Sequence, residues 1–228
     1  MLYEPLNLKI AVRRSKRIKR ITMRFTPPDK LSLSCPIGVS NNLIEEFVFR
    51  NENWLIDKKS RIESKVNVGV GVKIPFKGKL FSICRGDQLL KTCKIDDEKL
   101  FVVNDGKEVG LQVRNFLIRE IKETATPLAL RFSKILGENF KSLKFKDTKS
   151  RWGSCTSDKA LMLSWRLIMA PEDVLEYVVA HEVAHLRHMD HGVKFWETVK
   201  ILCQDYKRLR KWVRSEGVTL FNYNFGGT

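Results

Sequence analysis

Apolar and polar residues alternate along much of the first hundred positions, and this two-residue period is typical of half-buried β-strands. The expected strands lie at residues 6–12, 21–25, 31–35, 70–75, 80–84, 93–95 and 100–103. Turn-forming residues separate several of them, including Pro27-Pro28-Asp29 and Asn104-Asp105-Gly106. The pattern predicts an N-terminal β-rich region that ends near residue 106.

One helix interrupts these strands, and we expect it over residues 40–64. Ser40 suits the N-cap, because a serine hydroxyl accepts a hydrogen bond from the first turn of a helix. The positions expected to face the core are Leu43, Phe47, Trp54 and Ile62.

The apolar period changes to that of helices after residue 107. A long helix is predicted over 109–136, with Gly137 just beyond its end and a kink or restart at Thr126-Pro127. Short strands are expected at 143–146 and 161–169.

Two further helices complete this half of the chain. The first opens at Pro171 and the second runs from Gly192 to Gly217. We therefore predict an α+β protein, with a β-rich region at 1–106 and a second domain at 107–228.

All four histidines of the chain lie between residues 181 and 191, in a segment that begins His-Glu-x-x-His. Positions four apart lie on the same face of a helix, about 6 Å apart along its axis. His181 and His185 can therefore share one metal ion, with Glu182 beside them as a general base.

A catalytic zinc commonly has three protein ligands, and three residues compete for the third place. We favour His191, which reaches the ion only if the helix stops first, and Met189-Asp190 offers a stop. Its spacing from the other two histidines is also that of metzincins. Glu197 on the following helix ranks second, and His188 third, because an unbroken helix carries it too far along the axis.

These residues predict hydrolysis at a single Zn²⁺ ion. A bound zinc lowers the pKa of water and polarises a carbonyl, and Glu182 would transfer the proton to the leaving amine. Tyr177, Arg151 and Arg166 are weaker candidates for stabilising the oxyanion.

Composition narrows the class of protein. There are 42 Lys and Arg against 26 Asp and Glu, a net charge of +16, which attracts polyanions. The five cysteines are scattered without a C-x-x-C pair, so we expect reduced thiols in a cytoplasmic protein. We identify neither a secretory signal nor an apolar run of membrane-spanning length, and expect no membrane partner.

Six cations crowd the stretch from 13 to 20, and it is a candidate contact for DNA or RNA. It contains no aromatic residue for base stacking, so a solvated hairpin explains it equally well. The six are Arg13, Arg14, Lys16, Arg17, Lys19 and Arg20.

Several motifs together resemble the YgjP-like metal-dependent hydrolases. They are Arg151-Trp152-Gly153-Ser154-Cys155, Trp165-Arg166-Leu167, Ala170-Pro171, Tyr177-Val178-Val179, His181-Glu182-x-Ala184-His185-Leu186, His191 and Phe195-Trp196. The resemblance implies a zincin-like metallopeptidase domain, with zinc on His181, His185 and His191 and Glu182 as base. It also implies kinship with SprT and Wss-type peptidases, some of which cut proteins crosslinked to DNA.

The segment beginning Arg151-Trp152 has no role derived from its residues, and we place it near the substrate cleft or at a packed strand end. His188 is a bystander or supports a ligand. Two rival functions stay open beside a zinc peptidase acting on peptides or proteins. One is a nucleic-acid-binding module with a structural or vestigial zinc, and the other is a metal hydrolase acting on a non-protein amide.

Overall fold

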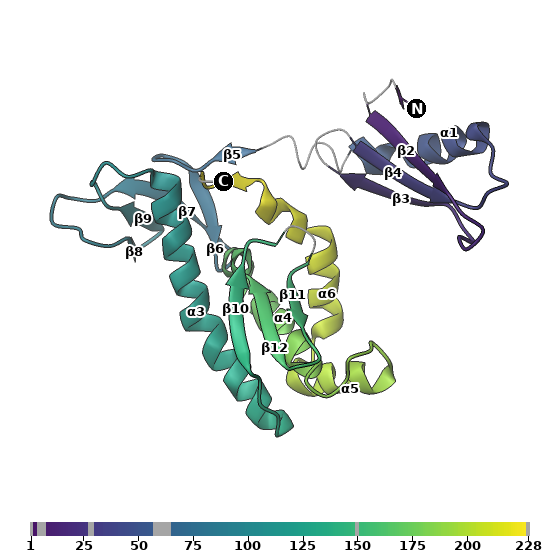
Figure 1. Ribbon diagram of the computed structural model, residues 1–228. Helices are drawn as coiled ribbons and strands as arrows, with labels where there is room; N and C mark the ends of the chain where they lie inside the picture. The colour runs from purple at the N-terminus through teal and green to yellow at the C-terminus, as the bar shows by residue number, and fades with distance from the viewer. Residues whose placement is uncertain (1, 4–7, 27–29, 57–64, 149–150, 227–228) are drawn as a thin grey trace. The chain divides into compact units, whose positions relative to one another are not determined.

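The backbone divides between Lys65 and Val66 into two units, each with its own apolar core. The computed structural model describes residues 2–3, 8–26, 30–56, 65–148 and 151–226 (Figure 1). The division lies about forty residues before the boundary that the turn at 104–106 indicated.

A four-stranded sheet forms the N-terminal unit, in the order β1-β2-β4-β3. Its strands are β1 (Leu2–Tyr3), β2 (Leu8–Arg14), β3 (Thr22–Thr26) and β4 (Lys30–Cys35). β4 is parallel to β2 and antiparallel to β3. Alternate residues of β4 are buried, as the two-residue period predicted.

The helix α1 (Asn41–Arg50) covers this core, and its N-cap is the predicted Ser40, whose Oγ accepts from the amide of Leu43. The face that it buries differs from the predicted one. Ile44 and Val48 are fully buried, whereas the side chain of Leu43 is about half exposed. Neighbouring residues lie about 100° apart around a helix, so the predicted stripe was one position out of phase. Trp54 is also exposed, and Ile62 lies outside the described residues.

A second four-stranded sheet, ordered β6-β7-β9-β8, opens the C-terminal unit. Its strands are β6 (Lys73–Phe76), β7 (Lys79–Arg85), β8 (Lys94–Asp96) and β9 (Lys99–Val102). A short β5 (Val66–Asn67) pairs with β13 (Tyr223–Asn224) near the far end of the chain. The sheet belongs to this unit because its apolar face packs against the long helix, with the rings of Phe76 and Phe116 5.6 Å apart.

That helix, α3 (Val109–Leu136), has the predicted bounds and ends at Gly137 in the left-handed conformation. Of the expected kink or restart at Thr126-Pro127, the restart was wrong, because one continuous helix includes Pro127. A proline inside a helix removes one backbone hydrogen bond. Ala125 and Ala129 on either side are fully buried, so tertiary packing supports the helix where that bond is missing.

A three-stranded sheet lies beside α3 in the order β10-β12-β11. Its strands are β10 (Ser142–Lys146), β11 (Gly153–Cys155) and β12 (Ala160–Ser164). β12 is parallel to β10 and antiparallel to β11. The strand predicted over 161–169 is therefore half right, since the chain turns into the 3₁₀ helix η2 (Trp165–Met169) after Ser164.

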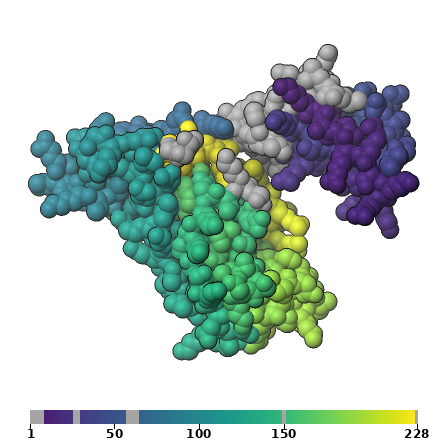
Figure 2. Space-filling model, in the orientation of Figure 1, coloured from purple at the N-terminus to yellow at the C-terminus, as the bar shows by residue number. Residues whose placement is uncertain are grey.

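Three helices follow and carry the candidate chemistry, with α4 packed against α3 and β11 (Figure 1). They are α4 (Glu172–Ala184), α5 (Val193–Leu202) and α6 (Tyr206–Ser215), before the short 3₁₀ helix η3 (Gly217–Phe221). The single last helix that we predicted is two helices, because Cys203 is extended. Figure 2 shows the yellow-green residues of α5 on the same face of the unit as the green residues that follow position 140.

All five cysteines are free thiols, as predicted. Among the described residues, no helix combines the length and the apolar character that crossing a bilayer requires.

Candidate metal centre

The helix α4 presents the histidines at its C-terminal end. Pro171 is the N-cap, and Glu172 and Asp173 occupy the first turn, where negative charge complements the helix dipole. The helix ends at Ala184, with His185 at the C-cap. We had placed its end near Met189-Asp190, and the structure ends it about one turn earlier.

The early end is held by contacts of the turn that follows. The amide of His188 donates to the carbonyl of Ala184, and the guanidinium of Arg187 donates to the carbonyl of Leu136 at the end of α3. The chain then reverses at Gly192, the N-cap of α5, and this reversal returns His191 to the histidines of α4.

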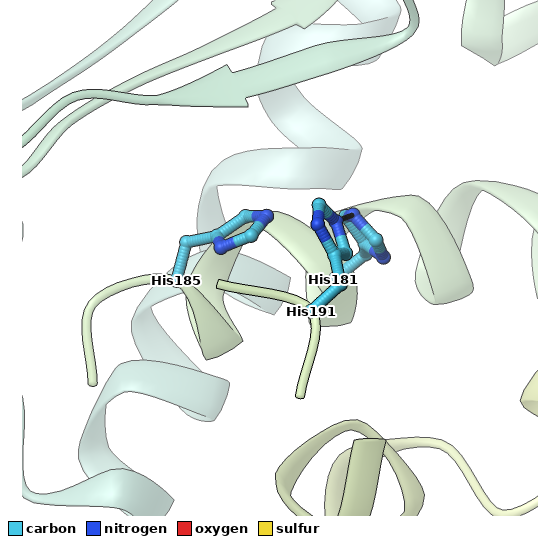
Figure 3. A group of neighbouring side chains, drawn as sticks. All are labelled: His181, His185 and His191. Carbon is cyan, nitrogen blue, oxygen red and sulfur yellow. Dashed lines mark hydrogen bonds between the residues drawn. The ribbon is translucent and has the colours of Figure 1, made fainter. Parts of the chain in front are cut away.

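Three imidazoles meet at this point, from His181, His185 and His191 (Figure 3). One ring nitrogen from each lies within 4.8 Å of the others, and the Nε2 atoms of His181 and His191 are 3.2 Å apart. Two nitrogens at 2.0–2.1 Å from a tetrahedral zinc lie about 3.3 Å apart. The side chains are therefore close to the spacing that a three-histidine site requires.

The protonation of these rings suits a cation. Burial, followed by the neighbouring charges of His185 and His191, lowers the pKa of His181 to about 3. Burial also lowers the pKa of His185. Metal ligands are neutral imidazoles, so these two rings are in the form that binds.

The backbone orients one ligand directly. Nδ1 of His185 lies 2.9 Å from the carbonyl oxygen of His188, so Nδ1 carries the proton and Nε2 is left free as a ligand. The contribution of His188 to the site is therefore a main-chain carbonyl. The buried Nδ1 of His181 has no hydrogen-bond partner in the part of the chain that the structure describes.

Phe195 packs against all three histidines of the site. Its fully buried ring lies 4.5–4.9 Å from the rings of all three histidines, measured between ring centroids. Trp196 flanks the site, 5.7 Å from His181 and 5.9 Å from His191. The sequence analysis named Phe195 only within the family motif Phe195-Trp196 and gave it no role beside the metal. Its place four residues after His191 was the available signal.

Glu182 lies beside the triad and is only 6% exposed. Burial raises the pKa of its carboxyl to about 8, against an opposing effect of the positive charge of Arg151. Burial is the usual means by which the pKa of a catalytic glutamate is raised toward the pH at which the enzyme works.

The backbone of Gly153 lies against this carboxyl. A β-carbon built at Gly153 would come within 2.5 Å of both Cγ and Oε1 of Glu182. Only a residue without a side chain allows β11 to pass so close. The segment from Arg151 to Cys155, which the sequence left without an explanation, therefore passes beside Glu182 on α4.

Trp152, the residue before Gly153, is held by contacts with residues near the C-terminal end of the chain. Trp152 packs its ring 4.8 Å from that of Phe221 and against Gly217, while its carbonyl accepts from the amide of Ser164. Arg151 is exposed.

Two of the weaker candidates for stabilising the oxyanion, Arg166 and Tyr177, are buried within the protein. Arg166 is buried, forms two hydrogen bonds with Asp147 at 2.7 and 3.0 Å, and also donates to the carbonyls of Leu220 and Tyr223. Four of its five N–H donors are therefore used within the protein, which gives Arg166 a structural role between β10 and the end of the chain. Tyr177 is buried 6.0 Å from the ring of His181, and burial raises its pKa to about 12.

Glu197 lies outside the group of neighbouring ligand atoms and is exposed on α5. The six cations between Arg13 and Arg20 lie in the N-terminal unit, at the end of β2 and in the turn before β3. Arg14 donates to the carbonyl of Val39 and to Asn41.

A model of the YgjP-like family, described as a metallopeptidase domain, matches residues 19–216. The chain belongs to the YgjP-like metallopeptidase family. This confirms the resemblance found in the motifs, and with it a metal-dependent peptidase and an α+β fold. The match begins inside the N-terminal unit and includes the whole of the histidine segment.

Two solved structures share weak similarity with the chain. The metallopeptidase zymogen of Pyrococcus abyssi abylysin is 19% identical, covers 40% of this chain and 93% of its own, and has a TM-score of 0.36. That of Methanocaldococcus jannaschii jannalysin is also 19% identical, covers 42% and 95%, and has a TM-score of 0.35. A search of curated proteins finds no match.

Proposed function

We propose that the chain is a zinc-dependent peptidase, with His181, His185 and His191 as the zinc ligands and Glu182 as the general base. The observation that carries the proposal is the convergence of three imidazole nitrogens within 4.8 Å, directly beside a buried carboxyl. Two of the imidazoles are held neutral, and one is oriented by the carbonyl of His188, as zinc ligands require.

His181, His185 and His191 would hold the zinc ion, which would supply a lowered pKa for a water molecule, toward about 7, and a Lewis acid for the substrate carbonyl. Glu182 accepts a proton from the attacking water and returns it to the leaving amine. Burial keeps solvent away from its carboxyl, and Gly153 limits the positions that the carboxyl can take. The ring of Phe195 packs against the three imidazoles and restricts their movement.

The buried carboxyl also favours catalysis over a structural zinc site. A structural site has four protein ligands and no use for a base, whereas this one presents three imidazoles and a carboxyl poised to move protons. Peptides are favoured over non-protein amides by the family to which the chain belongs.

The test combines metal analysis with peptide cleavage. We expect one zinc per chain in the wild type and loss of zinc in His185→Ala. Glu182→Gln should keep the zinc and lower kcat/KM by at least about a hundredfold. Glu176→Gln is the matched control, because Glu176 lies on the same helix and pairs with Arg131 on the surface. A wild type that holds no metal, or hydrolysis that does not depend on Glu182, would contradict the proposal.

A further inference from the structure

A second feature lies next to the metal centre and has no part in the mechanism above. It is a groove of about 620 Å³ between α5 and α6, which we call the α5–α6 groove. Its cationic lining residues are Lys200, Lys207, Arg210, Lys211 and Arg214, and its acidic lining residue is Glu197.

The positive charges of the groove have no acidic partner among the described residues, although Arg210 packs on the ring of Trp196. On α6, Lys207, Lys211 and Arg214 follow at intervals of four and three, so they share one face of the helix. Like charges at such spacing destabilise a helix when nothing neutralises them. Arg208 on the same helix pairs with Asp173 and Asp205 at 2.8 and 2.5 Å. None of the five groove cations forms an ion pair with the described part of the chain.

The groove begins one aromatic ring away from the zinc ligands. Trp196 lines it and lies 5.9 Å from His191, while the guanidinium of Arg210 stands 4.3 Å from the centre of the Trp196 ring. An extended peptide advances about 3.4 Å per residue. A chain with its scissile bond at the histidines therefore reaches Arg210 within about three residues.

The aromatic residues form a wall of the groove and are already engaged within the protein. Trp196 stacks on Tyr206 at 5.4 Å, and also contacts Phe195, His181 and Arg210. Single-stranded nucleic acids are held by aromatic faces on which bases stack. With these rings packed against each other, recognition by charge remains, and carboxylates are the matching groups on a peptide.

We propose that the α5–α6 groove binds acidic side chains of the substrate, so that the enzyme prefers to cleave polypeptides with a run of Asp or Glu close to the scissile bond. This rests on the peptidase function proposed above. The groove then serves as a specificity site, and its cations form ion pairs with the acidic side chains when substrate binds.

Paired peptides test this proposal. One peptide carries four Glu residues beside a constant neutral core, and its partner carries four Gln residues. Binding is measured by fluorescence anisotropy on zinc-loaded Glu182→Gln protein, and cleavage is measured on the zinc-loaded wild type. Exposed ion pairs each contribute about a twofold gain, so three or four of them predict a preference of about tenfold for the Glu peptide, which should shrink in high salt.

The decisive variant is Lys207→Glu/Lys211→Glu, in which the ratio between the two peptides should fall to about one. Lys99→Glu on β9 is the control for a change of charge elsewhere on the unit, and it should keep the ratio. Each variant is compared with itself on the two peptides, so a partial loss of stability does not affect the ratio. If the double variant does not fold, the salt dependence of the wild-type ratio decides the question.

The binding and cleavage measurements distinguish the groove proposal from the peptidase proposal. A Glu preference in binding without any cleavage upholds the groove and contradicts the peptidase. Cleavage with equal use of both peptides overturns the groove proposal and leaves the peptidase intact. Displacement of the Glu peptide by oligo(dT) at lower concentration than by unlabelled Glu peptide would also overturn it, in favour of nucleic acid.

Discussion

Replacing Gly153 with alanine tests how closely catalysis depends on the position of one carboxyl. The new β-carbon would lie 2.5 Å from Cγ and from Oε1 of Glu182. Non-bonded carbon atoms are best separated by about 3.5 Å. Glu182 or β11 must therefore move by about 1 Å.

A displacement of about 1 Å in a catalytic group costs about a hundredfold in rate. This corresponds to about 2.7 kcal/mol of transition-state stabilisation. We expect Gly153→Ala to lower kcat/KM on a fluorogenic peptide by that factor. Its zinc content should stay at one ion per chain, because the change touches none of the three histidines.

Two comparisons make the measurement specific. Gly69→Ala is the matched control, since a β-carbon at Gly69 meets no atom within 4 Å, and it should retain wild-type activity. In a Glu182→Gln background the alanine at 153 should cost less than about threefold, because residues that act through one another are not additive. A Gly153→Ala enzyme within about threefold of wild type would refute the reasoning.

Three further predictions follow from the same structure. In metal-free protein the pKa of Glu182 is 4.5 in the unfolded chain and about 8 in the folded chain. The free energy of unfolding of the wild type therefore decreases as the pH rises from about 4.5 to about 8, by up to about 5 kcal/mol. Metal-free Glu182→Gln should therefore melt above the wild type at pH 8 and close to it at pH 5, and equal differences at both pH values would contradict this. Removing zinc with a chelator should lower the Tm of the wild type and leave that of His185→Ala unchanged, because only a chain that binds the ion is stabilised by it. The expectation that the six cations between Arg13 and Arg20 contact DNA is tested by replacing them with Gln, which should weaken binding and flatten its salt dependence in filter binding at several salt concentrations; unchanged or absent binding would assign that stretch to solvent.

The local pattern of residues was sufficient to predict structure wherever the structure depends on one short segment alone. The bounds of α3, its left-handed glycine and the Ser40 cap follow from helical spacing and from the chemistry of single residues. The errors arise where distant segments compete. Pro127 stays inside a helix because Ala125 and Ala129 are buried on either side of it. The boundary indicated at 106 is a turn within a unit, because the sheet before it shares a core with the helix after it.

The candidate site shows the same division. His181, Glu182 and His185 are placed by the geometry of a single helix, and their spacing alone identified them. The place of His191 depends on where α4 ends, and the end is set by a turn that Arg187 ties to α3. The periodicity of the sequence cannot reveal this contact between Arg187 and the end of α3.

The sequence by itself determined the composition of the candidate metal centre, namely two imidazoles and a carboxyl on one helix, with a third imidazole nearby. The tertiary structure decided that His191 joins them, that Phe195 supports all three, and that Gly153 lies against Glu182. The reason is physical. A helix fixes the relation between residues three or four apart, whereas contacts between separate strands, turns and helices depend on packing that involves the whole unit.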